Sequence, residues 1–529
     1  MISQKELDVC KAREQFDRMC EFLEQALAEG QRVDQVERGL FPQAMTMCLQ
    51  MLRSFVAAHG DGDQGERVER EGKTLRRLAK PHDKRYLSIF GELLIGRYVY
   101  GTREGQAIVW SPLDAALGLP EGENSYVLED WLQRLCIQEA YGEAVESLRA
   151  WLGTTVSVRT AERMNREMSE DVEGFRGEAI PAPEEEEELL VVQADGKGVV
   201  MRRTLFARLR EESEAEEKEG DGNVEGTGMG GGALLACEEA TSSLPRAEKS
   251  AGQQESGAQR PGKKQMAYVG AVYSQGRFPR TADDVIDEVC RRKRAKDRPQ
   301  PQHKHVWAQM TRIAEGKVWL AAPMLFLSMM MECYLRNPAG KKLLICIMDG
   351  ERQLWKLAKD WFPRAVGILD LFHALKRLRD VAHCLFAPES PEAEEFVSHH
   401  LRMLLDGKVR YVLRNFRSLV KKHNLKGEKK KTVQSAITYY EKNQEHMRYD
   451  EYLAAGYPIA SGVAEGACKH LVKDRMERAG MRWELEGAQA MLSLRAVHVN
   501  GLWDQFIAYR IATQQSRLYG KDAQHATAI

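Results

Sequence analysis

The sequence predicts an α/β protein with a mixed central sheet flanked by helices. Two short, nearly all-apolar runs, residues 189–194 and 343–348, have the length and continuous hydrophobicity of strands that are buried on both faces. Other stretches, such as residues 126–168 and 387–453, repeat apolar side chains at the helical spacing of i, i+3, i+4 and i+7. The length of 529 residues allows about three to four domains of ordinary size.

Composition narrows the class of protein. There are 77 Lys and Arg residues against 78 Asp and Glu, and this balance excludes a uniformly basic coat for nucleic acid. The longest apolar stretches, such as residues 318–331, are too short or too interrupted to span a bilayer, and no signal peptide opens the chain. Ten cysteines without a CxxC pair do not indicate a disulfide framework. We expect a reduced, cytoplasmic protein with no membrane contact.

The N-terminal third predicts mainly helices. Residues 1–60 predict a helical hairpin, because apolar side chains recur on one face until Gly30 stops the first helix. Residues 86–100 predict a short β-hairpin around a glycine turn. Residues 140–166 then give a helix, a glycine turn and a Ser-capped helix, which is the outline of a helix-turn-helix. An ordinary αα-corner explains this outline equally well.

The middle of the chain alternates predicted strands with a long polar segment. Residues 211–262 are rich in Glu, Gly and Ser and predict a disordered acidic insertion, because they cannot bury enough apolar surface to offset the entropy of ordering. Residues 199–206 are predicted as the hairpin partner of the strand at 189–196, and residues 266–273 as a further strand next to them. A short strand at 366–370 precedes a helix that runs to residue 385.

The late part of the chain is predicted to be helical and locally basic. Residues 401–432 carry eleven Lys and Arg against Asp406 and Glu428. Such a segment is either a solvated helical face or a surface that contacts phosphates. Residues 456–505 predict two further helices, one of which contains Glu465, and residues 506–529 are expected to be a tail.

Three carboxylates carry the predicted chemistry. Asp195 and Asp349 each follow an apolar strand and precede a glycine, and Glu465 lies on a later helix. Such side chains can converge at one edge of a mixed sheet, where their oxygens suit Mg²⁺. Two such ions can activate a water or a 3′-hydroxyl and stabilise the leaving oxygen in phosphoryl transfer. For each Asp-Gly pair alone, an ordinary turn after a strand is the alternative.

A series of short motifs occurs in a fixed order along the chain. Their sequences are Gln193-Ala194-Asp195-Gly196, Met348-Asp349-Gly350-Glu351, Ile368-Leu369-Asp370-Leu371-Phe372-His373, Ser461-Gly462-Val463-Ala464-Glu465-Gly466-Ala467-Cys468-Lys469, Gly480-Met481-Arg482-Trp483 and Ala490-Met491-Leu492-Ser493-Leu494-Arg495. Together they resemble the DDE transposases of bacterial insertion sequences, close to the Kra group and more distantly the Mutator-type enzymes. The resemblance covers residues 85–505 except 211–262.

The resemblance implies a fold, a site and a cofactor. It implies an RNase H-like core formed by residues 188–386 and 456–505, with an all-α insertion domain at 387–455 and a DNA-binding region at 75–170. Asp195, Asp349 and Glu465 would be the catalytic, metal-binding triad for two Mg²⁺ ions, with Mn²⁺ as a substitute. Asp370 and His373 match an auxiliary Asp-x-x-His element of Mutator-like relatives. A helix N-cap Asp beside a semi-buried His is the simpler alternative.

Several residues are candidates for contact with DNA. Arg159 lies in the second helix of the predicted helix-turn-helix. Lys469 either contacts a phosphate or pairs with Glu465, and Arg482 and Trp483 either hold an unpaired base by stacking or, for the Trp, fill the core. The basic-segment candidates are Lys421, Lys422, Lys429, Lys430 and Lys431.

The predicted function is DNA transposition. The protein is expected to cleave at the ends of its own insertion sequence and to join the 3′-hydroxyls to target DNA. Its partners would be terminal inverted repeats, target DNA and further copies of itself in a homodimer or higher oligomer, at the nucleoid. The alternatives are an RNase H-like nuclease without strand transfer and a non-catalytic regulator that binds DNA through the helix-turn-helix. Intact Asp195, Asp349 and Glu465 favour the catalytic readings.

Overall fold

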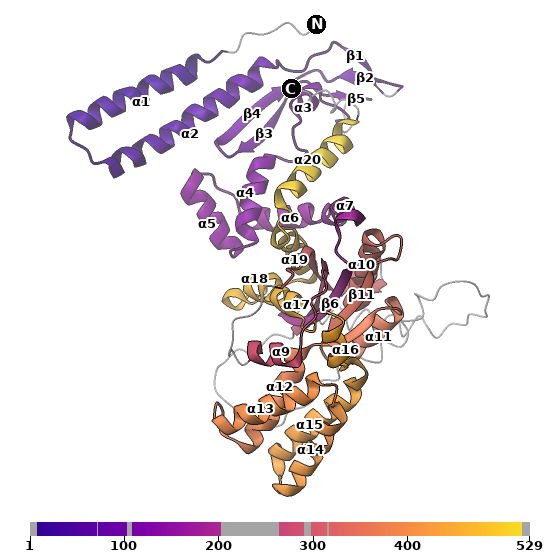
Figure 1. Cartoon of the computed structure of the whole chain (residues 1–529). Coiled ribbons are helices and arrows are strands. Elements are labelled where there is room, and N and C mark those ends of the chain that lie inside the picture. Colours follow the sequence, from indigo (N-terminus) through magenta and orange to yellow (C-terminus); the bar gives the residue numbers. More distant parts are fainter. Residues whose placement is uncertain are drawn as a thin grey trace.

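The computed structural model describes residues 8–70, 72–102, 108–202, 264–289, 298–314 and 317–520. The molecule is elongated, with the N-terminal elements at one end, the central sheet in the middle and a group of helices at the other end (Figure 1). The predicted acidic insertion at 211–262 lies outside the described residues.

The N-terminal end consists of a helical hairpin and two small sheets. Helices α1 (Cys10–Ala28) and α2 (Val33–Ala58) form the hairpin, and they approach closely where the ring of Phe22 packs on Gly39. The sheets are followed by α3 (Pro112–Leu117). Their strands are β1 (Arg67–Arg70), β2 (Lys73–Arg77) and β5 (Tyr100–Gly101) in one sheet and β3 (His82–Ser88) and β4 (Gly91–Arg97) in the other.

Four helices connect this end to the central sheet: α4 (Tyr126–Cys136), α5 (Tyr141–Leu152), α6 (Val158–Ser169) and α7 (Val172–Glu178). Between α5 and α6 the chain turns at Gly153, whose φ of 68° favours glycine, and the Ser157 hydroxyl caps α6. The two helices therefore have the predicted outline. The short 3₁₀ turn η1 (Pro183–Glu185) leads into the sheet.

The central sheet has five strands in the order β12-β11-β6-β7-β8. Strands β12 (Val366–Leu369), β11 (Leu343–Met348) and β6 (Leu189–Val200) are parallel, whereas β7 (Lys264–Gln275) and β8 (Gln302–Met310) continue the sheet in antiparallel fashion. The predicted hairpin partner of the first strand was wrong. Val199 and Val200 belong to β6 itself, and the partner is β7 on the far side of the residues that the structure does not describe.

Alternate side chains of β6 point into two hydrophobic cores, as the two-residue period of a strand requires. Leu190 and Val192 join a core with helices α10 (Ala321–Arg336), α11 (Arg352–Trp361) and α19 (Leu485–Val499). Leu189 and Val191 join the other core with α12 (Leu371–Leu385). The sheet is thus covered by helices on both faces, and α/β architecture is confirmed. Small elements complete this region: α9 (Ala282–Val289), β9 (Arg312–Ala314) and β10 (Lys317–Trp319).

Beyond β12 the chain is helical, as predicted. The helices are α12, α13 (Pro391–Leu405), α14 (Val409–Lys422), α15 (Gly427–Asn443), the 3₁₀ turn η3 (Gln444–His446) and α16 (Tyr449–Ala454). The predicted Glu465 helix is divided into α17 (Gly462–Ala467), a π-helical segment η4 (Cys468–Lys473) and α18 (Asp474–Met476), followed by η5 (Arg478–Gly480). π-helical turns are often found at functional sites.

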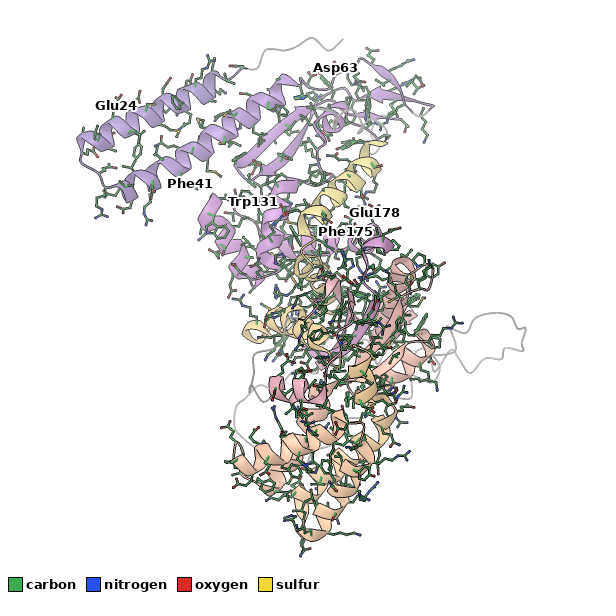
Figure 2. All side chains as sticks on the ribbon, in the orientation of Figure 1. Glu24, Phe41, Asp63, Trp131, Phe175 and Glu178 are labelled. Atoms are coloured by element: carbon green, nitrogen blue, oxygen red, sulfur yellow. The ribbon has the colours of Figure 1, made fainter. Side chains whose placement is uncertain are left out.

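The expectation of a C-terminal tail was wrong for residues up to 519. These residues form α20 (Trp503–Tyr519), which returns to the N-terminal end of the molecule (Figure 1). Its Arg510 is buried and forms an ion pair of 2.8 Å with the buried Glu129 of α4, and the Phe506 ring lies 5.5 Å from that of Phe175. The phenylalanine Phe175 is labelled in Figure 2. Apolar packing and a buried ion pair therefore hold the helix in place.

Candidate active site at the edge of the central sheet

Three neighbouring parallel strands deliver an aspartate to the same edge of the sheet. Ala194 of β6 pairs with Met348 of β11, and Met348 pairs with Leu369 of β12. The residue after each of these is an aspartate: Asp195, Asp349 and Asp370. Because the strands are parallel and in register, the three carboxylates lie side by side. The sequence predicted the first two at this edge and assigned Asp370 only an auxiliary role.

Asp195 differs from the other two because its strand continues. The prediction that the strand ends at Asp195 was wrong, since β6 pairs with β7 as far as Val200. Strand β11 has already ended at Met348, the partner of Ala194, and at the far end of β6 the Val200 carbonyl accepts a hydrogen bond of 3.0 Å from the Trp483 N–H. The Asp195 carboxylate accepts a hydrogen bond of 2.7 Å from the Gly196 N–H, and that of Asp349 accepts one of 3.0 Å from the Glu351 N–H.

Glu465 is tied to the sheet by a buried amide. Gln193 is fully buried on β6, and its Oε1 accepts a hydrogen bond of 3.0 Å from the N–H of Ala464. Its Nε2 donates to the Ala460 carbonyl at 3.2 Å and to the Tyr273 hydroxyl at 2.9 Å. This side chain therefore positions the start of α17 relative to Asp195. Sequence reasoning missed its role, although a Gln within an apolar strand is a signal for a buried hydrogen-bonding group.

Asp370, His373 and Glu465 form the tightest cluster. Their ligand atoms lie within 4.8 Å of one another, and in the described part of the chain this is the group of His, Cys and acidic side chains whose spacing could hold a metal ion. His373 Nδ1 is 3.0 Å from Asp370 Oδ2 and 3.7 Å from Glu465 Oε1. The buried Asp370 also accepts hydrogen bonds from the Ser461 hydroxyl and from the N–H of Phe372. Glu465 thus lies beside the Asp370–His373 pair, and its membership of a triad with Asp195 and Asp349 stays a prediction.

Burial and crowding of carboxylates shape the electrostatics of this edge. Burial raises the pKa of Asp349, and the nearby charges of Asp195 and Asp370 raise it further. Burial also raises the pKa of Glu465, with Asp370 and Asp195 acting in the same direction. The hydrogen bond to Asp370 raises the pKa of His373, which favours the imidazolium. Within the described residues, no Lys or Arg forms an ion pair with Asp195, Asp349 or Glu465.

Further side chains border the carboxylates. Tyr268 of β7 donates a hydrogen bond of 3.2 Å to Glu351, and burial together with Asp349 raises the pKa of Glu351. The buried thiol of Cys468 lies beside Asp195, and both burial and that carboxylate raise its pKa. The set of donors is dominated by carboxylate oxygens, which fit Mg²⁺ by their chemistry.

The predicted DNA-contact residues lie in different places. Arg159 is exposed in the first turn of α6, and the five predicted lysines are exposed at the end of α14 or the start of α15. Lys469 is exposed and forms no ion pair with Glu465, although the structure describes both residues. Arg482 is also exposed. Their contacts with DNA stay predictions.

Trp483 is a core residue, as the alternative interpretation held. It is 7% exposed, and its indole Nε1 donates a hydrogen bond of 3.0 Å to the Met476 carbonyl. Tyr141 and the Arg475 guanidinium pack against its ring. The ring is therefore occupied by protein and offers no surface on which a base could stack.

A family model matches part of the chain. Residues 324–509, about a third of the chain, match the model of an uncharacterised protein family, UPF0236. No curated protein matches the sequence. In the described part of the chain, no helix has the length and apolar character needed to cross a membrane. We call Asp195, Asp349, Asp370, His373 and Glu465 together the carboxylate edge. The segment that matches the family contains all of these residues except Asp195, which precedes it.

Proposed function

We propose that this protein is a DDE-type DNA transposase that cuts at the ends of its own insertion sequence and joins the 3′-hydroxyls to target DNA. One observation carries the proposal: Asp195, Asp349 and Asp370 follow three parallel strands in register, and Gln193 ties the Glu465 helix to the same edge. The mixed five-stranded sheet with helices on both faces supports an RNase H-like core. The action of such an enzyme would place it at the nucleoid.

The residues have separate roles in this proposal. Asp195, Asp349 and Glu465 would hold two Mg²⁺ or Mn²⁺ ions. Such ions, when bound, activate the attacking oxygen and stabilise the leaving oxygen of an in-line displacement. Asp370 orients His373, whose Nδ1 it holds at 3.0 Å, and the paired imidazolium partly neutralises Glu465. Cleavage by water and joining by a 3′-hydroxyl are both attacks on a phosphodiester, so one site serves both.

A strand-transfer assay tests the function. The full-length protein is incubated with Mg²⁺, a supercoiled target plasmid and labelled DNA that carries the inverted repeats flanking its gene. We expect labelled ends to become joined to the plasmid and Asp349→Asn to abolish both cutting and joining while binding persists. Cutting without joining would identify the nuclease alternative. Binding to the repeats with no Mg²⁺- or Mn²⁺-dependent cutting would identify the DNA-binding regulator.

We also propose that the protein acts as a homo-oligomer in which a second copy covers the helical hairpin α1–α2. Helix α2 has no buried residue along its length, and Phe41 projects from the hairpin in Figure 2. Large apolar side chains that are more than two-fifths exposed recur on both helices; they are Phe16, Leu23, Leu27, Val33, Phe41, Met51 and Phe55. Six cations and seven acids between residues 10 and 58 nearly balance, so two hairpins would not repel each other. Two hairpins make a four-helix bundle.

A further inference from the structure

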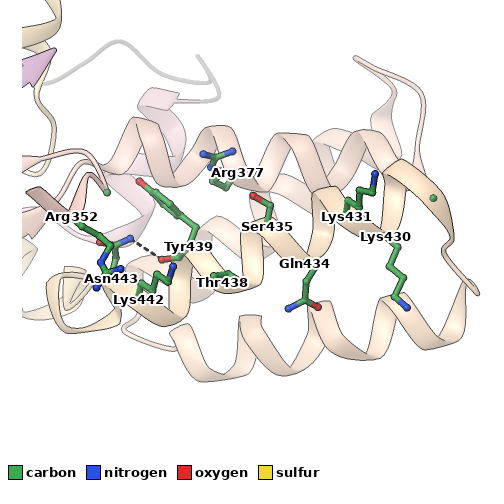
Figure 3. Close-up of a pocket in the computed structure, with 12 residues that line it drawn as sticks. Arg352, Arg377, Lys430, Lys431, Gln434, Ser435, Thr438, Tyr439, Lys442 and Asn443 are labelled. Carbon is green, nitrogen blue, oxygen red and sulfur yellow. Dashed lines mark hydrogen bonds between the residues drawn. The ribbon is translucent and has the colours of Figure 1, made fainter. Parts of the chain in front are cut away.

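A groove of about 790 Å³ begins beside Asp349 and follows helix α15. At one end it is lined by Gly350 and Arg352, one and three residues after Asp349, and at the other by Gly427 and Lys430 near the start of α15 (Figure 3). Its floor presents the neutral polar side chains Gln434, Ser435 and Thr438. Residues of α15 line the groove at intervals of three or four, so one face of the helix borders it along its whole length.

The charged side chains that line this groove are cationic. Five cationic side chains line it, and among the residues that the structure describes no carboxylate does. The cations are Arg352, Arg377, Lys430, Lys431 and Lys442. The structure describes all five, and Arg352, Lys430 and Lys442 form no ion pair in it. Lys431 pairs with Glu428 at 2.7 Å, but both side chains are at least three-quarters exposed, so this pair is weak. Arg377 lies 3.8 Å from Asp380. Three of the five cations are thus without an ion-pair partner among the described residues, next to a site rich in carboxylates.

The end of the groove at Asp349 has a fixed shape. The Tyr439 ring lies so close to Gly350 that a Cβ on this residue would meet it at 2.3 Å. The Arg377 guanidinium stacks over the same ring at 5.0 Å, and the Asn443 amide donates a hydrogen bond of 2.8 Å to the Tyr439 carbonyl (Figure 3). A strand in the groove would thus meet a packed wall and a cation immediately before the carboxylate.

We propose that this groove holds the phosphodiester backbone of a DNA strand and leads it to Asp349, with Arg352, Lys430 and Lys442 as the principal phosphate contacts. The inference rests on the proposed function, because only then is the strand a substrate. From Gly427 to Asn443 the helix spans about 24 Å, which equals about seven base-pair steps along the axis of a duplex. Hydroxyl and amide groups such as those of Ser435, Thr438 and Gln434 are common partners of phosphate oxygens.

The test measures binding without chemistry. Affinity of the full-length protein for a fluorescent 20-base-pair DNA of random sequence is measured by anisotropy in EDTA, from 50 to 200 mM salt. We expect the triple variant Arg352→Gln, Lys430→Gln, Lys442→Gln to bind more weakly and to show a shallower slope of log K against log salt, by about 2 to 3. The loss of affinity across this salt range should accordingly shrink by about 40-fold.

Two variants control for charge and folding. Lys341→Gln with Lys359→Gln removes exposed cations that do not line the groove, Lys341 lying beyond the opposite end of β11 from Asp349. We expect this double variant to keep the wild-type slope. Charge-retaining Arg352→Lys, Lys430→Arg, Lys442→Arg should also keep it. A wild-type slope in the Gln triple variant overturns the proposal, and so does competition by polyglutamate as strong as that by DNA of the same charge.

Different experiments test the proposed function and the proposal that DNA binds in the groove. If Asp349→Asn cuts DNA as well as the wild type does, the assigned chemistry is wrong, while the salt slope still decides whether DNA lies in the groove. If the slope is unchanged but Asp349→Asn abolishes cutting, the groove assignment alone is wrong.

Discussion

At the scale of single residues, Gln193 links the strand that carries Asp195 to the helix that carries Glu465. Its amide makes three hydrogen bonds in the core, and two of them hold the backbone that precedes and begins α17. The position of Glu465 therefore depends on a side chain on the strand that carries Asp195. An apolar substitute would leave the Ala464 N–H without its partner in a buried place.

We predict that Gln193→Met lowers both stability and cutting. Each buried polar group left unpaired should cost about 1–3 kcal/mol of the free energy of unfolding, measured by urea denaturation. Mg²⁺-dependent cleavage of DNA should fall as well, because Glu465 is no longer held. Gln133→Met is the matched control: Gln133 is equally buried and bonds Ala161 and Asn165 away from the carboxylate edge. It should lose stability yet keep the cutting rate of its folded fraction.

The carboxylate edge predicts an unusual dependence of stability on pH. Folding raises the pKa of Asp349 and of Glu465, so the native state holds these protons more tightly than the unfolded chain. Their contribution to stability is therefore present below the ordinary carboxyl pKa and is lost as pH rises through the raised values.

Without divalent cations, Asp349→Asn should accordingly be more stable than the wild type at pH 7, and the difference should vanish toward pH 4. Thermal unfolding at several pH values in EDTA measures it. Adding Mg²⁺ should stabilise the wild type and not the variant, because a ligand stabilises only the state that binds it. A variant less stable than the wild type at pH 7 in EDTA would contradict the raised pKa of Asp349.

At the scale of elements, α5 and α6 permit a test of sequence-specific binding. The buried face of α6 is anchored by Ala161, Met164 and Met168, which leaves Arg159 exposed in its first turn, where recognition helices contact bases. Arg159→Ala should reduce the preference for terminal-repeat DNA over random DNA by about 1–3 kcal/mol in competition binding. Arg163→Ala is the control, because Arg163 already pairs with Glu167 at 2.9 Å. Equal weakening on both DNAs by Arg159→Ala would favour the simple αα-corner.

The strands flanking the acidic insertion permit a second test at this scale. Strands β6 and β7 pair over twelve residues, and Val200 faces Lys264 at the end where the chain leaves and re-enters the described region. A short connection can therefore close this hairpin. We predict that replacing residues 212–257 by a Gly/Ser linker changes the free energy of unfolding by no more than about 1 kcal/mol, since loop closure depends weakly on length. A folded variant that loses oligomerisation or strand transfer would instead assign the segment a role in assembly.

Sequence patterns located the elements better than their ends. The apolar runs of β11 and β12 and the helix after Asp370 were predicted because burial on both faces leaves a continuous hydrophobic signal. The second half of β6 was not, because Asp195-Gly196-Lys197-Gly198 has the composition of a turn, and only pairing with β7 keeps it extended. The tertiary contacts that bury Trp483 and bring Glu465 to His373 leave no periodic signal either.

At the scale of the whole molecule, the exposed hairpin α1–α2 predicts the oligomeric state. Burying a phenylalanine side chain contributes about 1.5–3 kcal/mol, so Phe41→Asp with Phe55→Asp should raise the dissociation constant of the dimer by at least about 10-fold. Light scattering after size-exclusion chromatography measures this. Tyr334→Asp, at a side chain 67% exposed on α10, is the control and should leave the mass unchanged. A wild type that is monomeric at all concentrations would refute the covering of this hairpin by a second copy.

The late position of helix α20 in the sequence also affects the order in which the newly made chain folds. Arg510 follows its partner Glu129 by 381 residues, which at about 5–20 residues per second separates their synthesis by roughly 20 to 75 s. During that interval α4 has emerged from the ribosome while the helix that completes its packing does not yet exist. The Glu129 carboxylate must then remain hydrated rather than buried. The end of the molecule that carries α4 and α7 thus completes its packing against α20 only late in translation.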